Sequence, residues 1–153
     1  MKSDAQIILW RHADAEEMHS GGDLARELTA LGHKQAKRAG QWLDQYLPKG
    51  THILVSPAVR AQQTASALGR KFMTDDRVAP DAKTKGVLAA AQWPSVPCTL
   101  LVGHQPTLGK LASLLLTGSE KTWTIRKGAV WWIWLRPGHS QPSLRTVIDP
   151  ALL

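Results

Sequence analysis

Short apolar runs that end abruptly in polar clusters recur three times along the chain. Each run consists mostly of β-branched or leucine side chains and leads into arginine, histidine, serine or glycine. Runs this short and this apolar are typical of strands that are covered on both faces, as in a parallel sheet. The three segments are "IILWRH" (7–12), "HILVSPAVR" (52–60) and "TLLVGHQP" (99–106).

Helical periodicity fills the chain between and after these predicted strands. The first helix is stopped by Pro48-Lys49-Gly50. In the second helix we expect Ser56 to cap and Pro57 to take the first helical position, where its missing N–H costs nothing. Pro106 opens the third helix in the same way, and Gly118 closes it. The apolar stripes are Ala36, Ala39, Gly40, Leu43 and Leu47; then Ala61, Ala65 and Leu68; then Leu108, Leu111, Ala112 and Leu115.

The C-terminal third has a β-rich pattern instead. "TWTIRKGAVWWIWLR" (122–136) predicts a hairpin with a tight turn at Arg126-Lys127-Gly128, and "SLRTVID" (143–149) predicts a further strand after the Pro137-Gly138 loop. The hairpin contains four of the seven tryptophans, at positions 123, 131, 132 and 134. They could form a stacking platform for nucleic-acid bases. We favour core packing, because aromatic side chains dominate core burial.

Strands that alternate with helices predict an α/β fold. The expected architecture is a three-layer sandwich with a largely parallel central sheet and helices on both faces. The chain of 153 residues, 43% of them hydrophobic, fits a single domain over residues 1–153 and can build a core. The sequence shows no internal repeat and no interdomain linker.

The formal net charge of +7 arises from 19 Lys plus Arg against 12 Asp plus Glu. It favours an anionic ligand without distinguishing a phosphate from a nucleic acid or a membrane. The single cysteine, Cys98, cannot form an internal disulfide, so we expect a reducing compartment and a packed structural thiol. No stretch approaches the ~20 apolar residues of a membrane span. The apolar run in "MKSDAQIILW" is too short for a signal peptide, and we expect a soluble cytoplasmic protein.

The polar clusters fall where an α/β protein binds its ligands, beyond the carboxyl ends of the strands. Arg11 and His12 follow the first strand, Arg60 lies one turn into the helix after the second, and His104 follows the third. Two helix N-termini would point to the same place, and helix N-termini attract anions. Arginine suits such a site because its planar fork can bond two phosphate oxygens. The sequence therefore predicts a phosphate site at this edge of the sheet.

Histidine is the residue type left for covalent chemistry at this edge. No cysteine lies near the strand ends, and Ser56 is assigned to helix capping. The carboxylates do not pair at metal-binding spacing and the six histidines form no HxxxH or HxH arrangement, so we expect neither a metal nor an organic cofactor. A neutral imidazole can attack phosphorus and carry the phosphoryl group, which splits a difficult transfer into two steps.

Several segments together resemble the histidine phosphatase superfamily, the phosphoglycerate-mutase-like proteins. Arg11-His12-Ala13 is similar to the Arg-His-Gly signature of that family. The other segments are "LVSPAVRAQQTA" (54–65), "LLVGHQP" (100–106) and "ARELTALGHKQA" (25–36), the last with Glu27 in place of a proline. The resemblance covers residues 7–118 in order and spacing, and the short chain most resembles the SixA-type phosphohistidine phosphatases.

The resemblance implies roles for individual residues. His12 matches the nucleophile that is phosphorylated during turnover. Arg11, Arg60 and His104 match the pocket that holds the transferred phosphoryl group, and Arg26 matches an arginine that flanks it. These roles are physically coherent, because phosphoryl transfer depends on positioning and on neutralising charge on the equatorial oxygens. His104 would contribute most when protonated, a form that neighbouring phosphate favours.

The chain departs from the family pattern at two places. Ala13 replaces a glycine, so the local backbone must avoid positive φ. Larger members supply a glutamate as general acid from an insertion between the second and third motifs, whereas residues 70–97 here contain no glutamate. Asp14, Glu16 and Asp81 are the candidate acids. Further carboxylates nearby are Glu17, Asp75 and Asp76, and surface solvation is the favoured role of Asp75, Asp76 and Asp81.

The sequence thus predicts a phosphohydrolase that transfers a phosphoryl group to His12 and then to water. The expected substrate is protein phosphohistidine, with a phosphorelay protein as the partner of a monomeric enzyme. The alternatives are a small-molecule phosphomonoesterase, a mutase, and a non-catalytic polyanion-binding protein. Affinity for a polyanion would fall steeply with salt. The basic residues are scattered, with no run of five or more, so we expect no nucleic-acid partner.

Overall fold

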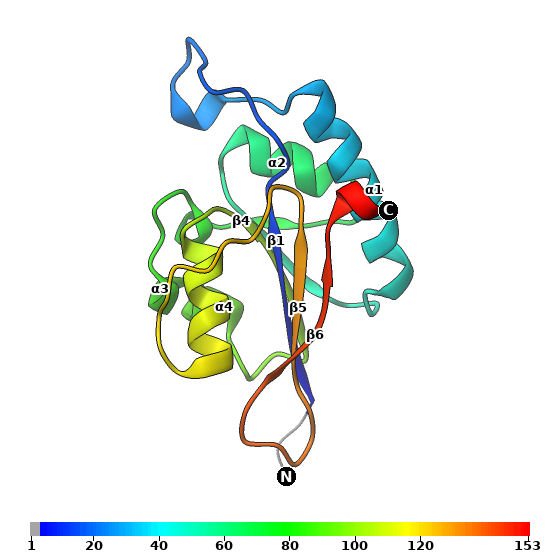
Figure 1. The fold of residues 1–153 in the computed structure, drawn as a ribbon, viewed down its shortest axis with the longest axis vertical. Coiled ribbons are helices and arrows are strands. Elements are labelled where there is room, and N and C mark those ends of the chain that lie inside the picture. The colour runs from blue at the N-terminus through cyan, green and yellow to red at the C-terminus, as the bar shows by residue number, and fades with distance from the viewer. Residues whose placement is uncertain (1–3) are drawn as a thin grey trace.

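One six-stranded sheet organises the computed structural model, which describes residues 4–153 (Figure 1). The strand order is β3-β2-β4-β1-β5-β6; the first four strands are parallel, and β5 and β6 each pair antiparallel with their neighbour. The strands are β1 (Ala5–Arg11), β2 (His52–Val55), β3 (Met73–Thr74), β4 (Cys98–Gly103), β5 (Val130–Leu135) and β6 (Ser143–Ile148). The first three residues of the segment discussed as a signal peptide lie outside the described residues.

Helices cover both faces of this sheet (Figure 1). Along β1, Ile8 and Trp10 pack in a core cluster with α1 and α2, whereas Ile7 and Leu9 pack in a second cluster with α3 and α4. The predicted α/β sandwich is confirmed, with a mixed sheet that is parallel over four strands. The helices are α1 (Ala30–Tyr46), α2 (Val59–Ser66), α3 (Thr84–Ala91) and α4 (Thr107–Thr117), with 3₁₀ turns η1 (Asp23–Ala25), η2 (Asp76–Val78) and η3 (Pro150–Leu152).

The apolar stripes predicted for three helices do face the core. All their residues are buried except Leu115, which packs half-buried against the α3/α4 side. Thr29 caps α1, because its Oγ1 accepts a hydrogen bond from the Gly32 N–H at 3.1 Å. Gly118 ends α4 in the left-handed conformation, as predicted.

The predicted start of α2 is wrong. The helix begins at Val59, after an extended Ala58, so Pro57 is not its first residue. Ser56 Oγ accepts a hydrogen bond from the Ala58 N–H at 3.1 Å in the turn before the helix. Its hydroxyl hydrogen and second lone pair stay available for another side chain. The start of α4 is shifted by one residue, because Pro106 is its N-cap and Thr107 its first residue.

The predicted hairpin over 122–136 is also wrong. Residues 121–126 form no strand, and β5 pairs instead with β6 across the loop at Pro137-Gly138. Two carbonyl groups of the non-strand segment bond to side chains rather than to a neighbouring strand. Gln105 Nε2 donates to the Trp123 carbonyl at 2.8 Å, and Arg11 Nη1 donates to the Ile125 carbonyl at 2.9 Å.

The tryptophans of this region are packing residues for the most part. Trp132 is buried and meets Trp42 of α1 edge-on, and Trp123 and Trp131 pack half-buried over the other core cluster. Cys98 is buried, which raises the pKa of its thiol, and this agrees with the predicted structural role. No helix within residues 4–153 has both the length and the apolar character needed to cross a bilayer.

The sheet has a topological switch point between β1 and β4. These neighbours are parallel, but β1 leads to α1 on one face and β4 leads to α4 on the other. The two connections diverge beyond the carboxyl ends of the strands and leave a crevice there, where open α/β sheets bind ligands. The fold thus places a site at the ends of β1 and β4.

Two helical glycines should respond oppositely to alanine. Alanine favours a helix over glycine by ~1 kcal/mol, and a Cβ at Gly86 of α3 would meet nothing within 4 Å. A Cβ at Gly109 of α4 would lie 1.7 Å from the Trp123 carbonyl oxygen. In urea unfolding, we expect Gly109→Ala to destabilise by about 1–3 kcal/mol and Gly86→Ala to stabilise slightly. Equal effects of the two substitutions would contradict this account of the packing.

Candidate active site

Parallel pairing of β1 with β4 brings His12 and His104 together. Arg11 lies opposite Gly103 in the register, and the His12 N–H continues the ladder by donating to the Gly103 carbonyl at 3.0 Å. The next residue of each strand is a histidine, and the two ring centroids are 5.1 Å apart. Both side chains are buried, with exposed fractions of 7% for His12 and 4% for His104.

The hydrogen bond of the His12 ring determines which nitrogen can act as a nucleophile. Nδ1 lies 2.8 Å from the Ala13 carbonyl oxygen. A carbonyl only accepts, so Nδ1 carries the proton and Nε2 of the neutral ring keeps its lone pair. The Ala13 N–H donates to Thr64 Oγ1 at 3.0 Å, and Ala13 lies outside the positive-φ region, as the sequence required.

Ser56 holds the ring of His104. The His104 Nε2 atom lies 2.7 Å from Ser56 Oγ, and that oxygen already accepts from the Ala58 N–H. A hydroxyl has one hydrogen to donate and two lone pairs. Ser56 can therefore donate to a neutral His104 or accept from a protonated one, and the contact is compatible with either charge.

Arg11 and Arg60 are each fixed by a backbone carbonyl. Arg11 Nη1 donates to the Ile125 carbonyl at 2.9 Å, and Arg60 Nη1 donates to the Asp23 carbonyl at 2.8 Å. The Nε atoms of both arginines are buried and have no hydrogen-bond partner within residues 4–153. Buried donors of this kind are costly unless a ligand pairs with them. The arrangement is that of a preorganised anion site.

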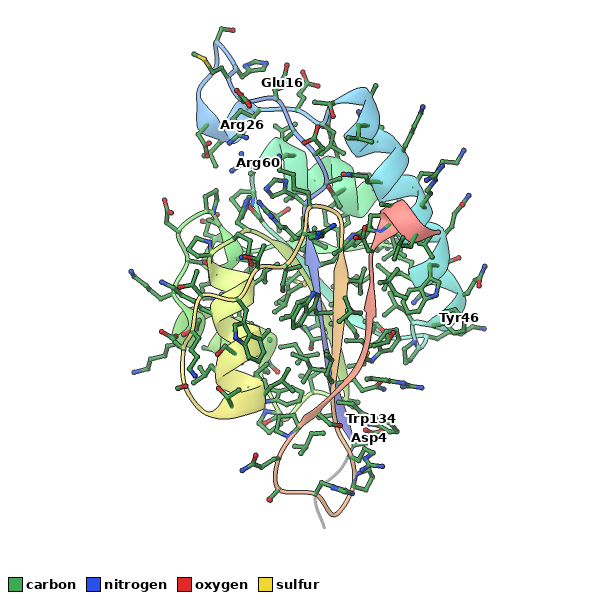
Figure 2. The ribbon with its side chains drawn as sticks, viewed as in Figure 1. Asp4, Glu16, Arg26, Tyr46, Arg60 and Trp134 are labelled. Carbon is green, nitrogen blue, oxygen red and sulfur yellow. The ribbon has the colours of Figure 1, made fainter. Side chains whose placement is uncertain are left out.

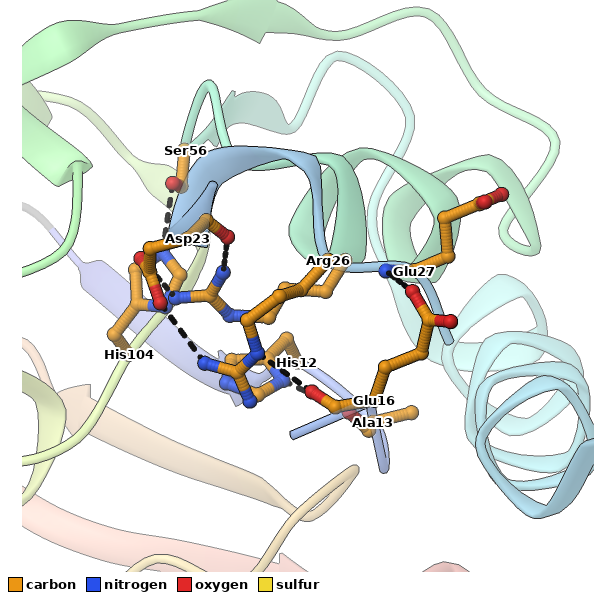
Figure 3. Close-up of polar contacts among 9 residues, drawn as sticks. His12, Ala13, Glu16, Asp23, Arg26, Glu27, Ser56 and His104 are labelled. Carbon is orange, nitrogen blue, oxygen red and sulfur yellow. Dashed lines mark hydrogen bonds and ion pairs between the residues drawn. The ribbon is translucent and has the colours of Figure 1, made fainter. Parts of the chain in front are cut away.

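Arg26 joins this site from the segment between β1 and α1. Its Nε donates to the Glu16 carbonyl, and its Nη1 lies 3.0 Å from Asp23 Oδ1 (Figure 3). The other carboxylate oxygen of Asp23, Oδ2, lies 3.2 Å from Arg60 Nη2. Asp23 thereby connects an arginine of α2 with an arginine of the β1–α1 segment.

These groups line a pocket of about 320 Å³. Figure 2 shows Arg26 and Arg60 at one end of the molecule, far from Asp4 and Trp134 at the other end of the sheet. The segment between the motifs at 54–65 and 100–106 contributes Pro80 and Asp81 to the pocket wall. The lining residues are Arg11, His12, Asp23, Arg26, Arg60, Pro80, Asp81, His104, Gln105 and Lys127.

Burial lowers the pKa values of the two histidines. It is the largest effect on both, and the pKa falls to about 4 for His12 and to about 3 for His104. Positive charge on Arg60 and Arg11 lowers both values further, because it repels a second cation. Both rings are therefore neutral at pH 7 in the free protein. The protonated form of His104 expected from the sequence would require the negative charge of a bound phosphate.

The structure separates the candidate acids. Asp81 lines the pocket, but Asp14 and Glu16 are not among its lining residues. Asp14 accepts from Thr29 Oγ1 at 2.6 Å and pairs with Lys127, and these hydrogen bonds lower the pKa of its carboxyl. Glu16 accepts from the Glu27 N–H. The remaining carboxylates weighed from the sequence also lie outside the pocket lining; they are Glu17, Asp75 and Asp76.

Glu16, His19 and Glu27 form a cluster that the sequence spacing did not indicate. Their possible ligand atoms lie within 4.8 Å of one another. The His19 Nδ1 atom accepts from the Gly21 N–H, so Nδ1 is not protonated and a neutral ring carries its proton on Nε2, the nitrogen that faces Glu27. That tautomer has no free lone pair for a metal. The cluster is a polar surface network beside the pocket.

Among the charged and hydroxyl side chains of the site, Asp23, Ser56 and Lys127 were not predicted from the sequence. Ser56 was assigned to helix capping and Lys127 to a turn. Asp23 lies three residues before Arg26, at i,i+3 spacing for an ion pair, and that spacing is the one signal that could have shown it.

Comparison with known proteins identifies the family of this chain. The model of the histidine phosphatase superfamily (branch 1) matches residues 7–83. A phosphohistidine phosphatase SixA homolog from Haemophilus influenzae is 34% identical over 125 residues, which cover 71% of this chain and 76% of the relative. Phosphohistidine phosphatase SixA from Escherichia coli is 28% identical over 122 residues, 74% of this chain and 75% of the relative. The chain belongs to the histidine phosphatase superfamily.

Solved structures share the whole fold. A structure of the protein histidine phosphatase SixA complexed with tungstate matches with a TM-score of 0.82 at 24% identity and covers 96% of this chain and 98% of its own. A putative alpha-ribazole-5'-P phosphatase from Escherichia coli matches with a TM-score of 0.67 at 17% identity, covering 95% and 97%. The fold is therefore that of the phosphoglycerate-mutase-like phosphatases.

The ring protonation of the two site histidines can be measured directly. In an NMR titration of the free protein we expect the His12 ring to titrate near pH 4 and the His104 ring near pH 3. The variants His12→Ala and His104→Ala assign the signals. Since the unfolded chain binds more protons between the ordinary pKa of 6.5 and these values, the free energy of unfolding falls as the pH is lowered through that range. Titration of both rings near pH 6.5 would contradict the burial argument.

Proposed function

We propose that this chain is a phosphohydrolase that takes a phosphoryl group from protein phosphohistidine onto His12 and then transfers it to water. One observation carries the proposal: the free Nε2 lone pair of His12 is buried beside arginines whose Nε donors have no partner. A neutral nucleophile in a preorganised cationic pocket is what phosphoryl transfer requires.

In the first step, His12 Nε2 attacks phosphorus and the bond to the leaving group breaks. The hydrogen bond from Nδ1 to the Ala13 carbonyl keeps the ring oriented and stabilises the positive charge that the imidazole acquires. Arg11 and Arg60 neutralise the equatorial oxygens with the remaining N–H groups of guanidinium groups that backbone carbonyls hold in place. His104, with its Nε2 held by Ser56, is available to bond a phosphoryl oxygen through its other nitrogen.

In the second step, water attacks the phosphohistidine from the side that the leaving group has vacated. The P–N bond breaks and its electron pair returns to Nε2, so His12 is regenerated as a neutral imidazole. The depressed pKa of His12 favours this step, because a ring that resists protonation in this pocket is restored as a free base.

The substrate class rests on the relatives and on the leaving group. Relatives from Haemophilus influenzae and Escherichia coli carry the name phosphohistidine phosphatase. The pocket of about 320 Å³ is at the small end for ligand sites, and suits a phosphoryl group on one amino-acid side chain. An imidazole can also bring its own proton as it leaves, whereas an alkoxide needs an acid.

Two other functions remain as alternatives. A small-molecule phosphomonoesterase would use the same pocket. The similarity in fold to a putative alpha-ribazole-5'-P phosphatase is the observation that favours this alternative. A non-catalytic polyanion binder was suggested by the charge and the tryptophans, but Trp132 is buried and Trp123 and Trp131 pack against the core. We further propose a monomeric, cytoplasmic enzyme whose partner is a phosphorelay protein; the buried, unpaired Cys98 supports a reducing compartment.

His12 should carry phosphate during turnover. Rapid quenching without acid followed by mass spectrometry should place an acid-labile, alkali-stable phosphate on His12, as expected of a P–N bond. His12→Ala should abolish hydrolysis, whereas His33→Ala, on the exposed face of α1, should not change it. Undiminished turnover in His12→Ala would end the proposal.

The substrate preference should follow the leaving group. We expect kcat/KM to be highest for protein phosphohistidine, lower for activated aryl phosphates and lowest for alkyl phosphates, because the leaving group depends more on a proton supplied by the enzyme in that order. Steady-state assays of these three substrate classes at one pH measure the ranking of kcat/KM. Sugar phosphates as the fastest substrates would favour the small-molecule phosphatase instead.

A further inference from the structure

The carboxylate of Asp23 is a prominent feature of the pocket that the proposed function leaves unused. Among the carboxylates of residues 4–153, Asp23 alone forms ion pairs with arginines that line the pocket. Its oxygens lie 3.0 Å from Arg26 Nη1 and 3.2 Å from Arg60 Nη2, and its backbone carbonyl also holds Arg60. Asp23 binds the Arg60 guanidinium directly. Only that guanidinium would therefore separate the Asp23 carboxylate from a phosphoryl oxygen bound to Arg60.

Asp23 lies on the side of the pocket from which a leaving group departs. The side chain of Asp23 is 57% exposed, whereas the residue His12, which would attack, is buried. In an in-line displacement the leaving atom lies opposite the nucleophile, and therefore toward the solvent-facing mouth. Figure 3 shows the Asp23 side chain with a dashed contact to Arg26.

Substrate binding would change the charge that surrounds Asp23. In the free protein the hydrogen bond from Arg26 is the largest of the effects that hold the pKa of the Asp23 carboxyl below its usual value, and Arg60 adds to it. A bound phosphoryl group would take N–H groups from Arg60 and place negative charge beside the carboxylate. Both changes raise the pKa of Asp23. The other charged or titratable groups of the pocket are Arg11, His12, His104, Lys127 and Asp81.

We propose that Asp23 is the catalytic proton donor to leaving groups that carry no proton of their own, the alkoxides and phenolates of phosphomonoesters, an inference that rests on the proposed phosphohydrolase function. The proton arrives with the phosphomonoester, whose second pKa is about 6, or from solvent. As the His12 Nε2–P bond forms and the P–O bond breaks, the electron pair goes to the leaving oxygen and the Asp23 proton neutralises it. When water attacks phosphorus and the P–N bond breaks, the Asp23 carboxylate accepts a proton from that water. Asp23 thereby returns to its protonated form.

A series of leaving groups tests this role. We would measure kcat/KM of the full chain and of Asp23→Asn on aryl phosphates whose phenols range from strongly to weakly acidic, and on an alkyl phosphate. The parameter kcat/KM reports steps up to departure of the leaving group. Asp23→Asn should lose about 10²–10⁴-fold on the alkyl phosphate, the range for a general acid. On the most acidic phenol the loss should be less than tenfold, because that phenolate leaves without a proton.

Asp75→Asn is the matched control. Asp75 also pairs with an arginine, Arg77, at 2.8 Å, and Arg77 likewise lowers the pKa of its carboxyl, but neither residue lines the pocket. Its kcat/KM should stay within a few-fold of the unsubstituted chain for every substrate. Because Asp23 is exposed, Asp23→Asn should fold, and its retained activity on the acidic phenol would demonstrate this.

Three results would overturn the proposal. An equal loss across the series would make Asp23 a residue that only positions the arginines, and an equal gain would make it a competitor of phosphate for Arg60. Leaving-group dependence in Asp81→Asn but not in Asp23→Asn would assign the acid to Asp81. Failure of the proposed function would look different, because the unsubstituted chain would then hydrolyse none of these phosphates and form no phosphohistidine at His12.

Discussion

The parallel pairing of β1 with β4 is the constraint on which the whole site depends. The register that sets Arg11 opposite Gly103 makes the next residue of each strand a histidine, and the His12 N–H completes the ladder on the Gly103 carbonyl. A shift of one residue would turn the side chains of β1 to the other face. Ile8 and Trp10 would then leave their core cluster, so core packing fixes the register and the register fixes the positions of His12 and His104.

The electrostatics of the pocket join two opposed requirements. In the proposed mechanism the phosphoryl group needs positive charge, which Arg11, Arg26 and Arg60 would supply, while the nucleophile His12 needs an uncharged ring. The arginines supply the positive charge. Burial and the arginines both lower the pKa of His12 and so keep its ring uncharged. The charge that binds the substrate is thus also the charge that keeps the nucleophile ready. Asp23 partly balances the cluster on its solvent side while no substrate is bound.

The fold class and the central residues could be predicted from the sequence because they lie at strand ends. Arg11, His12 and His104 directly follow apolar runs, so local pattern alone places them at one edge of a parallel sheet. Asp23 could not be placed in this way, because it lies in an irregular segment whose path depends on Arg60, 37 residues away. The hairpin over 122–136 was mispredicted because its β-rich composition does not reveal that the Trp123 and Ile125 carbonyls bond to side chains.

The pocket is assembled from segments that are distant in sequence: the ends of β1 and β4, the first turn of α2, the η1 segment, the loop with Pro80 and Asp81, and the turn before β5. No fragment of the chain brings these groups together, so affinity for phosphate is a property of the complete fold alone. By mass action, a ligand that binds only the folded state stabilises it, by about 2.7 kcal/mol at one hundred times its dissociation constant. An oxyanion bound in this pocket would therefore stabilise the sheet, both helical layers and the C-terminal strands together as one cooperative unit. The melting temperature would then measure the occupancy of the pocket.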